Sequence, residues 1–270
     1  MNSFYQDYLK TGSEESKEVV LDAAAVLMKR YKSEGYIQAW DEWEKSGFGK
    51  NNQYRMIIDT MCNLPLMFTA YDLTGDETYY NAAVSHADMA QKYLVRNDYT
   101  TAHTFLFNPD GTPNRRETHQ GYADDSCWAR GQAWAVNGFA QAYLMTGNKE
   151  YLNTAVRCCD VFLQKTDTDL VPRWDMVFQN NSNEPKDSSA AGILSCGMMD
   201  LWEATGNRWY KDAANQMFEV LYENYSSKDE AEEEGLILHA TGNKPGNVAI
   251  DCSLIYGDMY FAQLIDRLSE

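Results

Sequence analysis

Apolar and polar residues follow one another along this chain in two kinds of helical segment. The segments 61–71, 133–145 and 190–202 are apolar on nearly every side, whereas 82–94 and 152–163 are amphipathic. An all-round apolar helix has to be buried, and an amphipathic helix covers a core with one face. The pattern therefore predicts inner helices that are each paired with an outer helix.

A short repeated pattern marks the turn within each pair. A Thr-Gly dipeptide begins at Thr11, Thr74, Thr146 and Thr205, with an aromatic residue three positions before it and Ser, Asp or Asn directly after it. Glycine ends a helix in the left-handed conformation, and the following residue is a good N-cap for the next helix. Successive pairs are 63, 72 and 59 residues apart, which leaves room for long loops at one rim, where functional residues commonly lie.

These hairpins predict an all-α fold, an α/α toroid that forms a single domain over residues 1–270. A plain helical solenoid explains the hairpins equally well. Only ten residues precede Thr11, and 251–268 is patterned as an inner helix without an outer partner. We therefore expect the toroid to be incomplete at the N-terminus, with helices missing. Short strands are expected only at 104–107 and 235–239.

Charge and composition exclude several classes of function. The net charge of −17 argues against binding to nucleic acid, because no basic stripe is present to neutralise phosphates. No apolar run reaches the ~20 residues that cross a bilayer, so no membrane partner is expected. None of the six cysteines forms a Cys-x-x-Cys pair, and we predict neither a metal site nor a cofactor.

The first candidate for chemistry is Asp59, which stands among Ile, Met, Thr and Leu residues with Asn63 four positions later on the same helix face. A carboxyl in apolar surroundings has a raised pKa, which suits a general acid near neutral pH. The alternative is structural: Asp59 caps its helix or pairs with Arg55 or Arg130.

A second stretch, 119–134, combines polar and aromatic residues. Arg130 and Trp134 share one helix face, where the arginine either satisfies a buried carboxylate or receives an anionic ligand. The tryptophan can serve as a platform for a sugar ring. Asp124 and Asp125 are expected to cap the helix that follows them.

Five further positions are less specific. Trp40 and Trp43 lie in a loop before Asp59, where they pack or stack on a ring. Asp187 is expected to act as a helix N-cap. His86 is expected to be structural, and His103 lies in a loop-like stretch from which it can point into a cleft.

Taken together, these stretches resemble the unsaturated glucuronyl hydrolase family of glycoside hydrolases. The matching segments are IIDTMCNLPL (57–66), YNAAVSHAD (80–88), THQGYADDSCWARGQAWAVNGF (118–139), Trp174-Asp175, KDSSAA (186–191) and IYGDMYF (255–261). The resemblance implies an (α/α)6 barrel. It also implies a substrate: an oligosaccharide that carries a C4=C5 unsaturated uronic acid at its non-reducing end, as polysaccharide lyases leave it.

The implied reaction is hydration of that enol ether, for which one carboxyl acts first as acid and then as base. Ordinary glycosidases use two carboxylates instead. By resemblance Asp59 is the acid/base, and the residues expected to hold the substrate are Trp40, Asn63, His103, Gln120, Arg130 and Trp134.

One departure from the family pattern concerns a second essential aspartate in a His-Asp-x-Gly-Phe motif. The first four residues here look like the stretch just after that motif. The motif's absence favours a catalytically dead sugar-binding remnant as one alternative. The other is an unsaturated rhamnogalacturonyl hydrolase, against which the Asn63-Leu64-Pro65 and SSAA segments argue.

Overall fold

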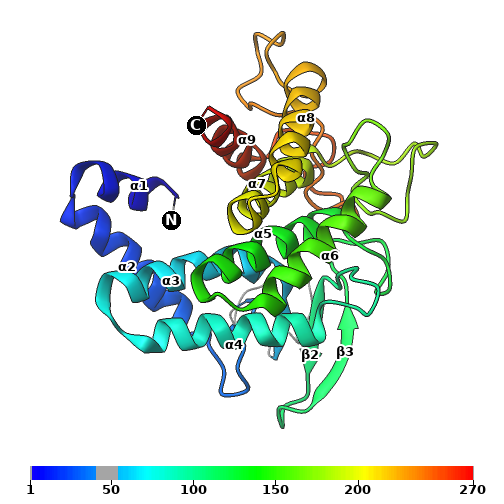
Figure 1. The fold of residues 1–270 in the computed structure, drawn as a ribbon. Coiled ribbons are helices and arrows are strands. Elements are labelled where there is room, and N and C mark those ends of the chain that lie inside the picture. Colours follow the sequence, from blue (N-terminus) through cyan, green and yellow to red (C-terminus); the bar gives the residue numbers. More distant parts are fainter. Residues whose placement is uncertain (1, 41–53, 270) are drawn as a thin grey trace.

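The computed structural model describes residues 2–40 and 54–269. Figure 1 shows a largely helical chain whose elements follow in this order: α1 Asn2–Thr11, α2 Glu14–Met28, β1 Arg55–Ile57, the 3-10 helix η1 Ile58–Asn63, α3 Leu64–Thr74, α4 Glu77–Tyr93, β2 Thr104–Phe107, β3 Pro113–Glu117, α5 Ala129–Thr146, α6 Lys149–Lys165, α7 Ser188–Thr205, α8 Arg208–Asn224 and α9 Ile255–Leu268.

The repeated Thr-Gly turns have nearly the same structure wherever they occur, as predicted. Their glycines adopt φ between 67° and 72°, and each glycine N–H donates to the carbonyl of the aromatic residue four positions earlier. In the turn after α5, the Thr146 hydroxyl donates to the Ala142 carbonyl and accepts from the Asn148 N–H. The side chain of Asn148 then accepts from the Glu150 N–H and caps α6. Contacts between residues a few positions apart therefore determine the turn of each hairpin.

Inner and outer helices alternate around an arc, which is the α/α toroid expected from the sequence (Figure 1). Helices α5 and α7 are buried along almost their whole length, whereas α6 and α8 bury one stripe each. Neighbouring inner elements approach closely at two glycines. A Cβ on Gly138 of α5 would lie 2.5 Å from Cβ of Met61, and one on Gly197 of α7 would lie 3.0 Å from the Asn137 backbone. These glycines let both η1 and α7 approach α5 closely.

A small antiparallel sheet adjoins η1, because its strand β1 leads directly into that helix. Its order is β1-β2-β3, with Met56 opposite Phe105 and Thr104 opposite Glu117. The strand expected at 104–107 is confirmed as β2. The strand expected at 235–239 is wrong: only Ile237 forms a bridge there, with Ser226, and the N–H groups of Leu236 and Ile237 donate to the Asp258 side chain instead of to a strand. The expectation of no other strands is also wrong, because β1 and β3 pair with β2. The sheet continues into η1, where the Ile58 N–H donates to the His103 carbonyl.

Among the helices in the described part of the chain, none has the length and apolar character needed to cross a bilayer.

Candidate active site

A cavity of about 450 Å³ lies between η1, α3, α5 and α9, beside the loop that precedes α5. The residues that line it come from η1, α3, α5, α9 and the loop before α5: Asp59, Cys62, Asn63, Pro65, Gln120, Arg130, Trp134, Gln141, Tyr256, Met259, Tyr260 and Gln263. Seven residues were predicted from the sequence as the acid/base and the substrate-binding residues, and five of them line this one cavity. Trp40 and His103 lie outside its lining.

Asp59 stands in the first turn of η1, so it is held by a 3-10 helix and not by the α-helix expected from the sequence. Its side chain is 31% exposed toward the cavity, whereas Oδ2 is buried. Burial raises the pKa of Asp59 to about 6, although the charge of Arg130 and the nearby Trp134 indole favour the ionised form. The carboxyl is thus half protonated near pH 6, and it keeps a fraction of the acid form at neutral pH, which suits a general acid.

His103 lies behind Asp59 and is buried. Its Nδ1 accepts the backbone N–H groups of His119 at 3.0 Å and Gln120 at 3.2 Å. Burial, followed by the charges around it, lowers the pKa of His103 well below its usual value, so the ring is neutral. A neutral ring that accepts at Nδ1 carries its proton on Nε2, which faces Oδ2 of Asp59 at 3.7 Å. Direct contact of His103 with a substrate stays a prediction.

Arg130 lines the same cavity and is 2% exposed, with its guanidinium close to the rings of Trp128 and Tyr256. Its Nη1 donates to Asp187 Oδ2 at 2.6 Å and to the Thr241 carbonyl at 2.8 Å, and Nη2 donates to the Gly242 carbonyl at 2.6 Å. The structural alternative, an arginine that satisfies a buried carboxylate, is therefore present. It does not exclude a ligand, because Nη2 carries a second hydrogen that these bonds leave over.

Asp187 does not act as the cap that the sequence suggested. It occupies the N-cap position of α7, but its carboxylate makes no capping bond to the helix backbone. Instead it binds Arg130 and accepts the hydroxyl of Ser189. A buried guanidinium nearby is the stronger partner for this carboxylate.

Asp124 likewise caps no helix. Helix α5 begins at Ala129, four residues beyond the carboxylate pair, with Trp128 at the N-cap. Oδ1 of Asp124 accepts the N–H of Thr118 and closes the loop that carries Gln120. The intervening loop, which the sequence pattern did not reveal, separates the pair from the helix.

Gln120 is held by two separate contacts of that loop. Its backbone N–H donates to His103, and the buried carboxylate of Asp175 accepts the N–H of Tyr122, two residues further along. Its side-chain Nε2 donates to the Gly242 carbonyl at 2.9 Å. The same carbonyl therefore accepts from both Gln120 and Arg130.

Sequence reasoning missed the face of α9 that closes the cavity. Tyr256, Met259, Tyr260 and Gln263 stand at helical spacing, and Tyr260 meets Trp134 edge-on with ring centroids 5.4 Å apart. The signal was available, because this inner helix carries two tyrosines, a methionine and a glutamine on one face, at positions i, i+3, i+4 and i+7.

The remaining predicted positions fall as follows. His86 is fully buried and accepts the N–H of Ile37, so the structural role expected for it is confirmed. Trp40 is half-buried and meets His119 edge-on at 5.5 Å. Trp43 lies outside the described residues. Within residues 2–40 and 54–269, no group of His, Cys, Asp and Glu side chains is arranged to hold a metal ion.

Comparison with known proteins bears on this arrangement. The model of Glycosyl Hydrolase Family 88 matches residues 2–150, more than half of the chain. The chain belongs to this family. Two relatives are similar over nearly its whole length. An unsaturated chondroitin disaccharide hydrolase of Streptococcus pneumoniae is 34% identical over 97% of the chain. An unsaturated glucuronyl hydrolase of a Bacillus species is 37% identical over 94%.

The fold agrees with the same family. The crystal structure of the unsaturated glucuronyl hydrolase from Bacillus sp. GL1, described as responsible for the degradation of glycosaminoglycan, matches 99% of this chain with a TM-score of 0.93 at 34% identity. This chain covers 72% of that structure, and it covers 66% and 68% of the two relatives named above. It thus spans about two thirds of their length.

Proposed function

We propose that this family 88 chain is a glycoside hydrolase that hydrates the C4=C5 enol ether of an unsaturated uronic acid at the non-reducing end of an oligosaccharide. The observation that supports this most is the state of Asp59. It is the one carboxyl among the described residues that line the cavity, and burial raises its pKa to about 6. Enol-ether hydration needs a single group that can give and then take a proton.

Asp59 performs both proton transfers in this proposal. The protonated carboxyl delivers its proton to C4, the double bond breaks, and positive charge develops at C5, shared with the ring oxygen. The resulting carboxylate then takes a proton from water as the water oxygen bonds to C5. The hemiketal opens at the ring oxygen, and the hemiacetal left at C1 releases the rest of the sugar. The neutral Nε2–H of His103, 3.7 Å from Oδ2, steadies the carboxylate between the two steps.

Substrate binding is proposed on the remaining walls. The spare Nη2 hydrogen of Arg130 offers a charged donor to the uronate carboxylate, against a chain of net charge −17. Trp134 and the α9 tyrosines offer apolar ring faces. Asn63 and Gln120 supply amide groups that match sugar hydroxyls, and we propose Trp40 as an outer aromatic wall.

The test is loss of the ultraviolet absorbance of the enol ether when the purified chain is mixed with an unsaturated glucuronyl disaccharide. An unsaturated rhamnogalacturonyl disaccharide serves as the matched comparison. Faster turnover of the glucuronyl substrate supports the proposal, and preference for the other disaccharide overturns the substrate class. Binding without turnover of either would identify a sugar-binding protein and refute the enzymatic proposal.

A further inference from the structure

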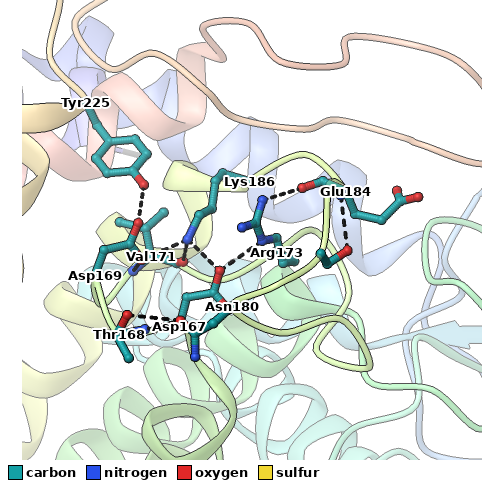
Figure 2. Close-up of polar contacts among 10 residues, drawn as sticks. Asp167, Thr168, Asp169, Val171, Arg173, Asn180, Glu184, Lys186 and Tyr225 are labelled. Atoms are coloured by element: carbon teal, nitrogen blue, oxygen red, sulfur yellow. Dashed lines mark hydrogen bonds and ion pairs between the residues drawn. The ribbon is translucent and has the colours of Figure 1, made fainter.

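The side chain of Lys186 ends in a cage of oxygen atoms outside the cavity. Its Nζ lies 2.7 Å from each of three acceptors, Oδ2 of Asp167, Oδ1 of Asp169 and the carbonyl oxygen of Val171, as Figure 2 shows. An ammonium group has three hydrogens, so each has an acceptor. The lysine side chain is 15% exposed and that of Asp167 only 3%. The side chain of Asp169 is 43% exposed, so the cage is buried on the Asp167 side and open to solvent on the Asp169 side. The chain itself fills this cation site.

Two further residues brace the cage. Arg173 donates from Nε to Oδ2 of Asp167 at 2.9 Å and from Nη1 to the Glu184 carbonyl at 2.6 Å. Tyr225, just after α8, donates its hydroxyl to Oδ2 of Asp169 at 2.6 Å. Both ends of the loop between α6 and α7 are therefore tied to one another and to the end of α8 (Figure 2).

The backbone of Lys186 leads from this cage directly to the cavity. The next residue, Asp187, binds Arg130, and its N–H donates to the Pro172 carbonyl at 2.9 Å. The Lys186 carbonyl accepts the hydroxyl of Thr241 at 2.7 Å, next to the carbonyls that Arg130 contacts. Two consecutive residues thus link the cage on one side with the Arg130 wall on the other.

We propose that Lys186 is a positioning residue of the site: its ammonium is the permanent cation of the Asp167–Asp169–Val171 cage. Through the cage it fixes the backbone from which Asp187 reaches Arg130 and to which Thr241 is tied. Two carboxylates here face two cations, Lys186 and Arg173. Without the ammonium, the carboxylates of Asp167 and Asp169 have only one cation beside them, Arg173. Because Asp167 is buried, this excess of negative charge is strongly unfavourable. The cage then loosens, and Arg130 loses its fixed partner.

The variant that tests this is Lys186→Ala, because the atoms it removes correspond to n-propylammonium. Lys149→Ala, at an exposed lysine on α6, is the matched control. Melting temperature and hydrogen–deuterium exchange of residues 238–243 are measured for both variants, each with and without added n-propylammonium chloride or 1-propanol. We expect Lys186→Ala to melt about 5–10 °C lower and to exchange faster at 238–243. Propylammonium restores both quantities toward wild type, whereas propanol does not, because the cage requires the charge.

A kinetic measurement distinguishes a positioning role of Lys186 from a role in stability alone. Only this measurement rests on the proposed function. With the unsaturated disaccharide, KM of Lys186→Ala is expected to rise about tenfold with little change in kcat, because the cage connects to Arg130 and not to the element that carries Asp59. Wild-type melting and exchange in Lys186→Ala, equal rescue by propanol, or a fall in kcat at unchanged KM would each overturn the proposal. A wild-type chain that fails to turn over the disaccharide refutes the proposed function, while the melting, exchange and rescue measurements still decide the role of the cage.

Discussion

The Nε2 atom of His103 lies 3.7 Å from Oδ2 of Asp59, and the backbone fixes which ring nitrogen carries the proton. Two N–H groups occupy Nδ1, so the Nε2–H has to face the carboxyl. The contact is longer than a hydrogen bond, as catalytic contacts often are before the substrate binds. The pair thus combines Asp59, an acid whose pKa is raised, with His103, whose neutral ring is held by the backbone as the Nε2–H tautomer.

Asp59→Asn should preserve the fold and lower turnover at least about 100-fold, because an amide cannot deliver the proton to C4. Circular dichroism and the absorbance assay test both statements. Asp72→Asn, at an exposed aspartate of α3, is the matched control and should keep full activity. Activity of Asp59→Asn within tenfold of wild type would remove Asp59 from the mechanism.

The same variant should be more stable than wild type at neutral pH. The pKa of Asp59 is about 6 in the folded chain and 3.8 in the unfolded chain, so the folded chain keeps the proton between these two pH values. The stabilisation that this proton contributes is complete below pH 3.8 and is lost as the pH rises to about 6. Asparagine has no such loss. Asp59→Asn should therefore gain up to about 3 kcal/mol over wild type at pH 7.5 and nothing at pH 3.5. Denaturant unfolding at the two pH values measures the difference, and an equal gain at both would contradict the assignment.

The pH dependence of turnover follows from the same group. Above pH 6 the acid form of Asp59 becomes scarce, so kcat/KM should fall about tenfold per pH unit on the alkaline side. A rate profile with the unsaturated disaccharide between pH 5 and 8.5 tests this. A profile that stays flat to pH 8 would mean that another group donates the proton.

His103→Phe should destabilise the chain by about 1–3 kcal/mol, because it leaves the partly buried backbone N–H groups of His119 and Gln120 without their acceptor. His103→Asn, whose side-chain oxygen can accept from the backbone, is the paired variant and should cost less. Both should lower kcat, since neither restores the Nε2–H beside Asp59. Equal stability of the two variants would show that the backbone contacts contribute little.

The Arg130–Asp187 pair offers a double-mutant cycle. Each partner is nearly fully buried, so Arg130→Ala and Asp187→Ala should each cost about 3–5 kcal/mol by leaving the other charge unpaired. The double variant should cost clearly less than the sum, because neither charge then remains. Additive costs in chemical denaturation would indicate that each residue acts through other partners.

Sequence patterns predicted the parts of this molecule that depend on neighbouring residues. The Thr-Gly turns form from atoms within a few residues of one another, so Gly147 and Asn148 could be assigned their roles directly. The partner of Arg130 could not, because Asp187 lies 57 residues away and only the packing of α5 against α7 brings the two together. The 3-10 geometry at Asp59 was hidden for a related reason. It follows from the sheet before η1 and from the close approach at Gly138, neither of which is written in the local pattern.

The Gly242 carbonyl accepts from both Gln120 and Arg130, so it competes with a bound ligand for those two donors. A ligand oxygen that takes both places has to wait for the 240–252 segment to withdraw, so the apparent affinity is the intrinsic affinity multiplied by the fraction of molecules already open. Ala249 and Asp251 of this segment are held at φ of 51° and 54°, a left-handed conformation that costs about 1–2 kcal/mol at a non-glycine residue. Substitutions in this segment would then scale the affinity for every ligand that uses the two donors by one common factor, and would leave the preference between such ligands unchanged.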